Sequence, residues 1–426
     1  MFDQGVQAMI ARDLVIIGGG SAGMAAAIAA YDEGLTDILI VEKGRQLGGI
    51  LNQCIHHGFG IEEFKEQLTG PEFMSRLAVE VKKRNIDVRF QSNVLDLTKN
   101  KVVTYSNAAE GIVKVQAKAV IMATGCYERS AGAIQIPGER PSGIITAGTA
   151  QLYLNEMGAL VGKRVFILGS GDIGLIMARR LTLEGATVLG VSEIMPYSNG
   201  LNHNMVQCLH DFDIPLYLSH TVTKTYGKSR LEKIEISQVD EKFNPLPGTE
   251  KEFEVDTLLL SIGLIPSNDL LKKLGLPVSK SRGAIVDEHY MTDIPGIFST
   301  GNVLHVHDLA DYVAAESRSC GKGAAAYVQG KWDLNSPSFD VTPGKNLLYV
   351  VPHRVRLANL DEHLTIKFRV SKPLQNQILT FTFNGEVIKK IIKPFIIPSE
   401  MQKVRLPKEL FNCQDGELVI SSEDRP

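Results

Sequence analysis

The sequence predicts an α/β protein with two related halves, one inserted in the other, and a small C-terminal β domain. Three observations lead to this prediction. A βαβ pattern with a glycine-rich turn begins at Leu14 and again at Val165. A third segment of similar kind, residues 296–302, follows both halves, so the second half interrupts the first. After about residue 335, alternating apolar and polar residues replace the helical periodicity.

The composition is that of a globular protein with no nucleic-acid or membrane specialisation. The 426 residues are 44% hydrophobic and 22% charged, enough for a few domains of roughly 100–200 residues each. The formal net charge of -3 leaves no basic excess to neutralise a phosphate backbone, so we expect no nucleic-acid partner. Five cysteines are too few and too scattered for a disulfide framework. Glycines break the uncharged run Leu14–Ala30, so we expect no membrane span and a cytoplasmic protein.

The first βαβ pattern starts with residues 14–20, Leu-Val-Ile-Ile-Gly-Gly-Gly, which is typical of a buried parallel strand. A helix is expected over Met24–Tyr31, and Gly34 marks its end. A second apolar strand, Ile38–Val41, then leads to the acid Glu42. This order of elements predicts a βαβ unit with parallel strands.

Gly18, Gly20 and Gly23 have the spacing of the dinucleotide-binding fingerprint. The first glycine allows the tight turn, the second lets the backbone approach a pyrophosphate, and the third lets the helix pack closely on the strand. Glu42 follows Gly23 by 19 residues, where a carboxylate can accept hydrogen bonds from ribose hydroxyls. A glycine-rich turn without a ligand is the weaker alternative.

The second half repeats this order. A strand over Val165–Gly171 enters a helix over Leu175–Leu183, Gly185 ends the helix, and the next strand ends at Glu193. We interpret Asp172, at the helix entry, as a residue of the helix start rather than a catalyst.

Gly169, Gly171 and Gly174 form the second fingerprint, and Glu193 again follows the last glycine by 19 residues. A carboxylate at this position would repel a 2′-phosphate, and Ile194–Gly200 contains no Lys or Arg to bind one. The second half therefore favours NAD(H) over NADP(H). The alternative for Glu193 is a solvated acid at the end of a strand.

Two further apolar strands end at a glycine, Ala119–Gly125 and Thr257–Gly263, one in each half. Gly296–Asn302 returns to the first half after both. We expect two Rossmann-like nucleotide-binding domains with the following boundaries: residues 1–135 with 271–335, and residues 136–270.

The tail, residues 341–426, is expected to be a small β-rich domain. Asn384-Gly385 between two alternating runs is a strong signal for a type I′ hairpin. The only helical pattern in the tail is a short one near Pro407–Phe411. The expected strands are Leu364–Val370, Ile378–Phe383, Val387–Ile392 and Leu418–Ile420.

The order of these motifs resembles that of the pyridine nucleotide–disulfide oxidoreductase superfamily, over about residues 10–330. The resemblance implies that the first fingerprint binds FAD, with Glu42 at its ribose. It implies that the inserted domain binds NAD(P)H, with Glu193 at the NAD ribose. The family usually has Gly-Asp where this chain has Gly301-Asn302, and asparagine can still hydrogen-bond the ribityl chain. The expected cofactor-binding residues are Gly18, Gly20, Ser21, Ala22, Gly23, Glu42, Lys43, Gly48, Gly49, Ala123, Thr124, Gly125, Gly169, Gly171, Asp172, Ile173, Gly174, Glu193, Gly263, Gly301 and Asn302.

Members of this superfamily commonly pass hydride from NADH through the flavin to a pair of cysteines. This sequence contains no Cys-x-x-Cys, and after Gly48-Gly49 it has only Cys54. A dithiol reductase is therefore not expected. Cys54 is a candidate catalytic thiol of the sulfenic-acid type, and the alternative is that it packs beside the cofactor. Cys126, Cys208, Cys320 and Cys413 show no mutual spacing, and we interpret them as structural thiols.

Two histidine clusters flank the expected flavin, His56-His57 and His305-x-His307. The second cluster precedes the final expected helix, Leu309–Val328, whose N-terminus would face the pyrimidine end of the flavin. His305 and His307 are candidate catalytic acid–base residues. Packing around the cofactor is the alternative, and we expect no metal.

Longer strings such as Gly48–Gly60 and Gly301–His307 resemble a narrower group. It comprises FAD/NAD-binding oxidoreductases associated with glycerol-3-phosphate dehydrogenase and the α subunits of opine, proline and hydrogen cyanide-forming dehydrogenases. Three functions follow. The leading one is an FAD-dependent NAD(P)H oxidoreductase that passes hydride from NADH to an unidentified acceptor without a dithiol. The second is an FAD-binding electron-transfer subunit of a glycerol-3-phosphate or amino-acid dehydrogenase complex, with a partner flavoprotein dehydrogenase and the tail as docking module. The third is a lone-cysteine NADH oxidase or peroxidase. A homo-oligomer is compatible with each.

Overall fold

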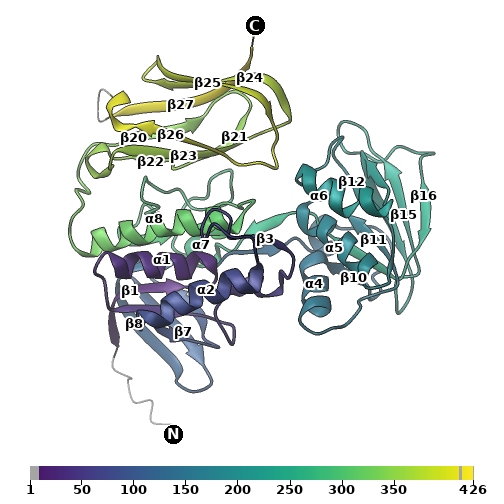
Figure 1. Ribbon diagram of the computed structural model, residues 1–426, viewed down its shortest axis with the longest axis horizontal. Helices are drawn as coiled ribbons and strands as arrows, with labels where there is room; N and C mark the ends of the chain where they lie inside the picture. Colours follow the sequence, from purple (N-terminus) through teal and green to yellow (C-terminus); the bar gives the residue numbers. More distant parts are fainter. Residues whose placement is uncertain (1–8, 412–414, 426) are drawn as a thin grey trace. The chain divides into compact units, whose positions relative to one another are not determined.

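The computed structural model describes residues 9–411 and 415–425, which fold into two compact units (Figure 1). The first unit combines the chain up to Cys126 with the chain from Pro266 onward, and the second comprises Tyr127–Ile265. The inserted unit thus begins and ends somewhat earlier than the expected domain 136–270. The C-terminal β strands belong to the first unit.

The first unit is built on a mixed sheet whose parallel part is the expected βαβ fold. β1 pairs in parallel with β2 on one side and β8 on the other. β19 pairs in parallel with β8, with Ile297 opposite Val120, so the segment after the insertion does return to the first sheet. The N-terminal part of β8 continues into an antiparallel meander with β7 and β6. The strands of this sheet are β5 (Asp87–Arg89), β2 (Ile38–Val41), β1 (Ile10–Ile17), β8 (Gly111–Met122), β7 (Val102–Asn107), β6 (Asn93–Leu97) and β19 (Ile297–Ser299).

Helices α1 and α8 pack against each other beside this sheet (Figure 1). α1 is alanine-rich and buried nearly all round, as expected of a helix enclosed by other elements. A Cβ at Gly321 of α8 would lie 2.1 Å from the Ala26 carbonyl oxygen, so glycine is required for this close approach. The helical segments here are α1 (Ser21–Asp32), η1 (Gly49–Gln53), α2 (Gly70–Lys83), α7 (Asp269–Lys273), η3 (Gly301–Val303) and α8 (Ala310–Val328), and the short strands are β3 (His57–Phe59) and β4 (Leu68–Thr69).

The second unit repeats the parallel fold around β11, which lies between β17 and β12. A separate antiparallel sheet of β14, β15 and β16 follows in the chain. The strands are β9 (Cys126–Glu128), β10 (Ile144–Thr146), β11 (Arg164–Leu168), β12 (Thr187–Glu193), β13 (Leu216–Leu218), β14 (His220–Tyr226), β15 (Lys233–Gln238), β16 (Lys251–Glu254), β17 (Thr257–Leu260) and β18 (Leu264–Pro266). The helical segments are α3 (Ala131–Ile134), α4 (Ala147–Asn155), α5 (Asp172–Leu183), α6 (Asn202–Cys208) and η2 (His210–Phe212).

The C-terminal strands form two sheets around one apolar core, which we call the sandwich (residues 339–424). Asn384 and Gly385 join β24 to β25 with φ angles of 48° and 85°, as a type I′ turn requires. The larger sheet holds β22 (Arg354–Val355), β20 (Phe339–Pro343), β27 (Gly416–Asp424), β24 (Leu374–Phe383) and β25 (Glu386–Ile396). The smaller holds β21 (Leu347–Val351), β23 (His363–Val370) and β26 (Gln402–Pro407), and the short helical turns are η4 (Leu357–Asn359) and η5 (Lys408–Leu410).

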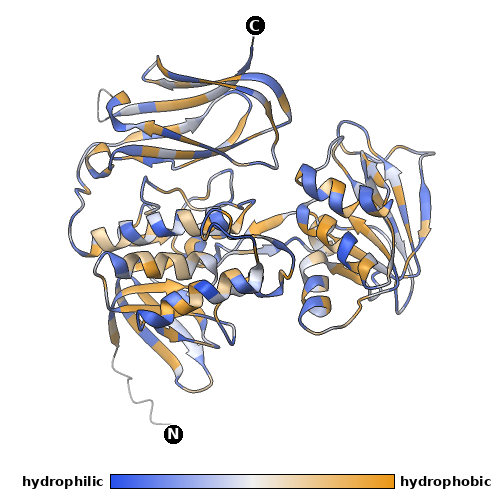
Figure 2. Ribbon diagram, viewed as in Figure 1, coloured by the Kyte–Doolittle hydropathy of each residue, from blue (hydrophilic) through white to orange (hydrophobic). Residues whose placement is uncertain are grey.

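Apolar residues run along the central strands of the first sheet and alternate with polar residues in the strands of the sandwich (Figure 2). The two patterns differ because the parallel strands are buried on both faces, whereas a sandwich strand buries one face in its own core. Among the described residues, no helix is long and apolar enough to cross a membrane.

Candidate functional site

The first glycine fingerprint has the geometry that each of its three positions requires. Gly18 has a φ of 108°, and a Cβ there would lie 2.4 Å from the Ala123 carbonyl oxygen. A Cβ at Gly23 would lie 1.9 Å from the Gly18 carbonyl oxygen, so α1 packs directly on the turn. A Cβ at Gly20 would meet no atom within 4 Å. The turn is therefore crowded at its ends and open in its middle, where a ligand can approach the backbone.

The start of α1 is arranged to receive an anion. Gly20 is the N-cap residue, no side chain caps the helix, and the first turn holds no acidic residue. The first N–H groups of a helix lack partners within the helix. The backbone N–H groups at the start of α1, including those of Ser21 and Ala22, can therefore donate to a phosphate at the open side of Gly20.

Glu42 is held against the glycine turn by two backbone donors. It is 6% exposed, its Oε2 accepts a hydrogen bond from Gly19 N at 2.6 Å, and its Oε1 accepts one from Gly44 N at 2.6 Å. The neighbouring Lys43 is exposed. A carboxylate has acceptor sites beyond these two bonds, so Glu42 can also accept from the hydroxyls of a ribose.

The following loop completes the wall of this site. Gly48 N donates to the Gly19 carbonyl oxygen at 2.9 Å, and a Cβ at Gly49 would lie 3.4 Å from the Gly20 Cα. Both loop glycines have positive φ, 126° at Gly48 and 57° at Gly49.

The end of β8 lies beside the same turn. Ala123 N donates to the Ile17 carbonyl oxygen at 2.9 Å, and Thr124 Oγ1 donates to the Ser267 carbonyl oxygen at 2.9 Å. Gly125 and Gly301 have φ angles of 68° and 73°. At Gly301 a Cβ would lie 2.9 Å from the Ala22 Cβ, so the turn after β19 closes on the first residues of α1.

The second fingerprint is crowded at its ends like the first, but its middle glycine is less open. Gly169 has a φ of 98°, and its Cβ would lie 2.2 Å from the Ser261 carbonyl oxygen. A Cβ at Gly174 would lie 2.7 Å from the Ser261 Cβ, and one at Gly171 would lie 3.2 Å from the Ser261 Oγ. Gly263, which follows β17, has a φ of 95° and open space at its Cβ position.

Glu193 occupies the position that Glu42 has in the first unit. It is 3% exposed, and its Oε2 accepts from Ser170 N at 3.0 Å and Ser170 Oγ at 2.7 Å. Asp172 is turned to the next helix, where its Oδ1 accepts from Leu201 N at 2.8 Å and Asn204 Nδ2 at 2.7 Å. Ile173 is half-buried against the local core.

Cys54 follows η1 and is 8% exposed. Its thiol donates to the Ile50 carbonyl oxygen at 3.5 Å, and its own carbonyl accepts from Gly70 N at 2.9 Å. A Cβ at Gly70 would lie 2.9 Å from the Cys54 Cβ, so Cys54 packs tightly on the start of α2. These contacts account for a packing role, and the redox role of Cys54 stays a prediction.

The other cysteines differ in environment. Burial raises the pKa of Cys208 to about 11 and holds that of Cys320 well above its usual value, as expected of unreactive thiols. Cys126 lies at the start of β9, where it accepts a hydrogen bond from Asn302 Nδ2 at 3.7 Å. Sequence spacing gave no signal for this contact. Cys413 lies outside the described residues.

The side chains of His305 and His307 are both buried and both meet Glu316 of α8. The distances to Glu316 Oε2 are 2.8 Å from His305 Nε2 and 3.3 Å from His307 Nε2. Burial lowers the pKa of His305 to about 3, so this ring is neutral at pH 7. The acid–base role of the two histidines stays a prediction.

The cation of this cluster is Lys367 of β23. Its Nζ lies 2.5 Å from Glu316 Oε2. Burial opposes the ammonium form, but the Glu316 carboxylate raises the pKa of Lys367 to about 12. The donor atoms of His305, His307 and Glu316 lie within 4.8 Å of one another. Because Lys367 already supplies a cation there, the cluster fits a metal ion poorly.

Asp311, in the first turn of α8, was missed by the sequence analysis. It is 3% exposed and accepts three backbone hydrogen bonds, from Gly60 N at 3.0 Å, Glu62 N at 3.0 Å and Glu63 N at 2.9 Å. The loop between β3 and β4 is therefore fastened to the start of α8. A single acid in an expected helix gave no signal of this contact.

A family model described as "Pyridine nucleotide-disulphide oxidoreductase" matches residues 12–320. The chain is 25% identical over 334 residues to hydrogen cyanide synthase subunit HcnB of Pseudomonas aeruginosa, covering 74% of this chain and 68% of that protein. It is 25% identical over 398 residues to mitochondrial dihydrolipoyl dehydrogenase 1 of Arabidopsis thaliana, covering 85% and 74%. Thioredoxin reductase from T. acidophilum superimposes with a TM-score of 0.62 at 23% identity, covering 76% of this chain and 99% of that structure.

Proposed function

The chain belongs to the pyridine nucleotide-disulphide oxidoreductase family, and on that premise we propose that it passes hydride from NADH through FAD to an acceptor without a redox dithiol. It is an FAD-dependent NAD(P)H oxidoreductase of this family. The observation that carries the proposal is the presence of two complete glycine turns in one chain, each with its own buried acid, Glu42 and Glu193.

The residues of the first unit fit FAD. The open side of Gly20 and the uncapped start of α1 would hold the pyrophosphate, and Glu42 would hold the adenosine ribose. Gly301 and Asn302 would face the ribityl chain. Asn302 Oδ1 accepts from His307 N at 3.0 Å, which holds the amide in place. When bound, FAD supplies the two-electron redox chemistry of hydride transfer.

The second unit supports a preference for NADH. Glu193 places its carboxylate beside the glycine turn, where it would disfavour a 2′-phosphate and accept hydrogen bonds from ribose hydroxyls. Ile194–Gly200 offers no Lys or Arg as a counter-charge. The role of these side chains is to bind the nucleotide and orient it, since alignment of two reactants supplies much of a hydride-transfer rate.

The spacing and burial of the cysteines support an acceptor other than an internal dithiol. The sequence has no Cys-x-x-Cys. Burial disfavours the thiolate at Cys208 and Cys320, and Cys54 is enclosed by η1 and α2. We therefore assign the chain an acceptor that takes its electrons directly from the flavin.

Anaerobic stopped-flow absorbance of the FAD-loaded protein tests this proposal. Mixing with NADH should bleach the flavin band near ~450 nm within the first turnover, and NADPH should do so much more slowly. Cys54→Ser run in parallel should bleach at the same rate. Absence of bleaching with both nucleotides would overturn the proposal, because electrons would then enter elsewhere.

A second candidate function is that of an electron-transfer subunit. It is favoured by the 25% identity to a protein named as a subunit of hydrogen cyanide synthase. Co-expression with a candidate flavoprotein dehydrogenase, followed by size-exclusion chromatography, tests it. Elution as one complex would support this function, and separate elution at micromolar concentration would argue against it.

A further inference from the structure

The smaller sheet of the sandwich presents a polar face to the nucleotide-binding part of its own unit. Along β23, Leu364, Ile366 and Phe368 enter the sandwich core. The alternate residues Lys367 and Arg369 point the other way. Lys367 pairs with Glu316 of α8, and Arg369 pairs with Asp308 just before α8.

Glu316 joins this face to the turn after β19. Its Oε1 accepts from Gly301 N at 2.9 Å and from Thr300 Oγ1 at 3.2 Å. Its Oε2 accepts from Lys367 Nζ at 2.5 Å. One carboxylate therefore binds the Gly301 N–H and the Thr300 hydroxyl with one oxygen and Lys367 of the sandwich with the other.

Lys367 is the group that makes this arrangement possible. Glu316 is fully buried in its side chain, and a buried carboxylate is stable only when it is paired and hydrogen-bonded. Lys367 itself is 5% exposed, and its second contact is Tyr290 OH at 3.2 Å. With Lys367 in place, burial lowers the pKa of His305 to about 3, so its ring adds no positive charge beside Glu316 at pH 7.

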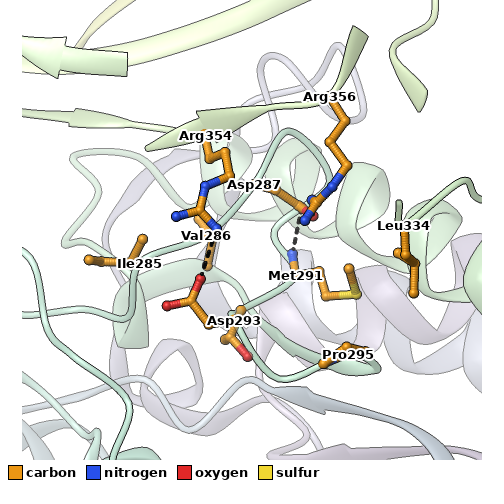
Figure 3. Close-up of a pocket in the computed structure, with 10 residues that line it drawn as sticks. Ile285, Val286, Asp287, Met291, Asp293, Pro295, Leu334, Arg354 and Arg356 are labelled. Atoms are coloured by element: carbon orange, nitrogen blue, oxygen red, sulfur yellow. Dashed lines mark hydrogen bonds and ion pairs between the residues drawn. The ribbon is translucent and has the colours of Figure 1, made fainter. Parts of the chain in front are cut away.

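The sandwich is fastened at a second place, beside a cavity of about 330 Å³ (Figure 3). Arg354 of β22 and Arg356, just after β22, reach to the loop below, where Arg354 Nη1 lies 3.2 Å from Asp293 Oδ1 and Arg356 Nη1 lies 3.1 Å from Asp287 Oδ2. The charged groups that line this cavity pair with one another. These ion pairs are a second point at which the sandwich contacts the nucleotide-binding part of its own unit.

We propose that Lys367 is a positioning residue for FAD, and that the sandwich is thereby part of the FAD site rather than a separate docking module. This inference rests on the proposed function in one respect, the assignment of Gly301 to the flavin side. Lys367 neutralises Glu316, Glu316 fixes the Gly301 backbone, and Gly301 closes on the start of α1 at Ala22.

The test compares Lys367→Met with Glu316→Gln in the full chain. In metal sites, mutation of a residue that holds a metal ligand in place typically lowers the affinity for the metal about 10–100-fold. We expect FAD binding, followed by flavin fluorescence, to weaken by about the same factor in both variants. The flavin midpoint potential should fall in Lys367→Met, because the negative charge of Glu316 is left unbalanced. It should rise in Glu316→Gln, because the positive charge of Lys367 is left unbalanced.

Lys390→Met is the matched control. Lys390 lies on β25 of the larger sheet and is exposed, so FAD affinity and potential should stay at the parent values. A purely structural role for Lys367 would lower the unfolding temperature and leave both flavin properties unchanged, and that result would overturn the inference. If Lys367→Met does not fold, Glu316→Gln carries the test by the sign of its potential shift. Dithionite replaces NADH as reductant, so failure of the proposed hydride transfer would not be mistaken for failure here.

Discussion

Gly20→Ala should leave the apoprotein intact and selectively weaken FAD binding. Gly20 has φ -76° and ψ -169°, which an alanine adopts without strain. Its Cβ would meet no protein atom within 4 Å. The same methyl group occupies the open side of the turn, which we assign to the pyrophosphate.

The size of the effect on the apoprotein follows from two opposing terms. Replacing glycine by alanine stabilises by about 0.4–1 kcal/mol, because the unfolded chain loses conformational freedom. Loss of a favourable N-cap residue costs roughly 0.5–1 kcal/mol. These terms nearly cancel, so the free energy of unfolding should change by less than about 0.5 kcal/mol. An overpacked methyl in the complex costs about 1–3 kcal/mol, which is about 5- to 150-fold in the Kd for FAD.

The assay is urea unfolding of the apoprotein combined with a fluorescence titration of FAD. Gly23→Ala is the contrasting variant, because its Cβ would lie 1.9 Å from the Gly18 carbonyl oxygen and should destabilise even the apoprotein. Gly132→Ala, in α3 with its nearest contact at 3.8 Å, controls for the added methyl. If Gly20→Ala binds FAD with the affinity of the parent, the assignment of the pyrophosphate to this turn is refuted.

Three further predictions concern the nucleotide, the pH dependence and the thiol. Glu193→Gln should lower the NADH-over-NADPH ratio of kcat/KM by about tenfold, the size of one screened charge repulsion; an unchanged ratio would contradict the role of Glu193. Burial lowers the pKa of His353 to about 4. As the pH drops from 6.5 toward 4, His353 is therefore protonated in the unfolded chain before it is protonated in the folded protein, and the free energy of unfolding falls. His353→Asn, which keeps an acceptor for Val286 N, should flatten that slope in urea unfolding between pH 4 and 7, and a parental slope would speak against it. Cys54→Ser should leave oxygen and peroxide turnover unchanged, because Cys54 packs on η1; loss of that turnover would favour the peroxidase interpretation.

Local sequence signals predicted the parts of the fold in which neighbouring residues decide the structure. The helix expected over Leu309–Val328 is α8, Ala310–Val328, and the Asn384-Gly385 turn joins two strands as expected. β20, β21, β22 and β26 were missed. β21 (Leu347–Val351) has no two-residue period, because its residues Tyr349 and Val351 belong to the core of the nucleotide-binding part and Val350 to that of the sandwich.

The residues of the candidate site likewise divide into those that local spacing predicts and those whose partners are distant in the chain. Glu42 and Glu193 were predicted because their offset from a glycine fingerprint is a local property, and both lie on a glycine turn. Asp311 could not be predicted, because its partners lie about 250 positions earlier in the chain. Cys126 approaches Asn302 for the same reason, through the pairing of β8 with β19 rather than through spacing.

Lys367 shows why a correct strand prediction can still misplace a functional residue. The alternation along Leu364–Val370 predicts a strand with an apolar face and a polar face. For an isolated sandwich the polar face belongs to solvent, where a lysine is worth little. Here the nucleotide-binding part of the same unit covers that face. The same period-2 pattern therefore places Lys367 at 5% exposure beside a buried carboxylate. A sequence pattern records which side of a strand is polar, but the element that packs against that side decides whether the charge is solvated or becomes part of a binding site.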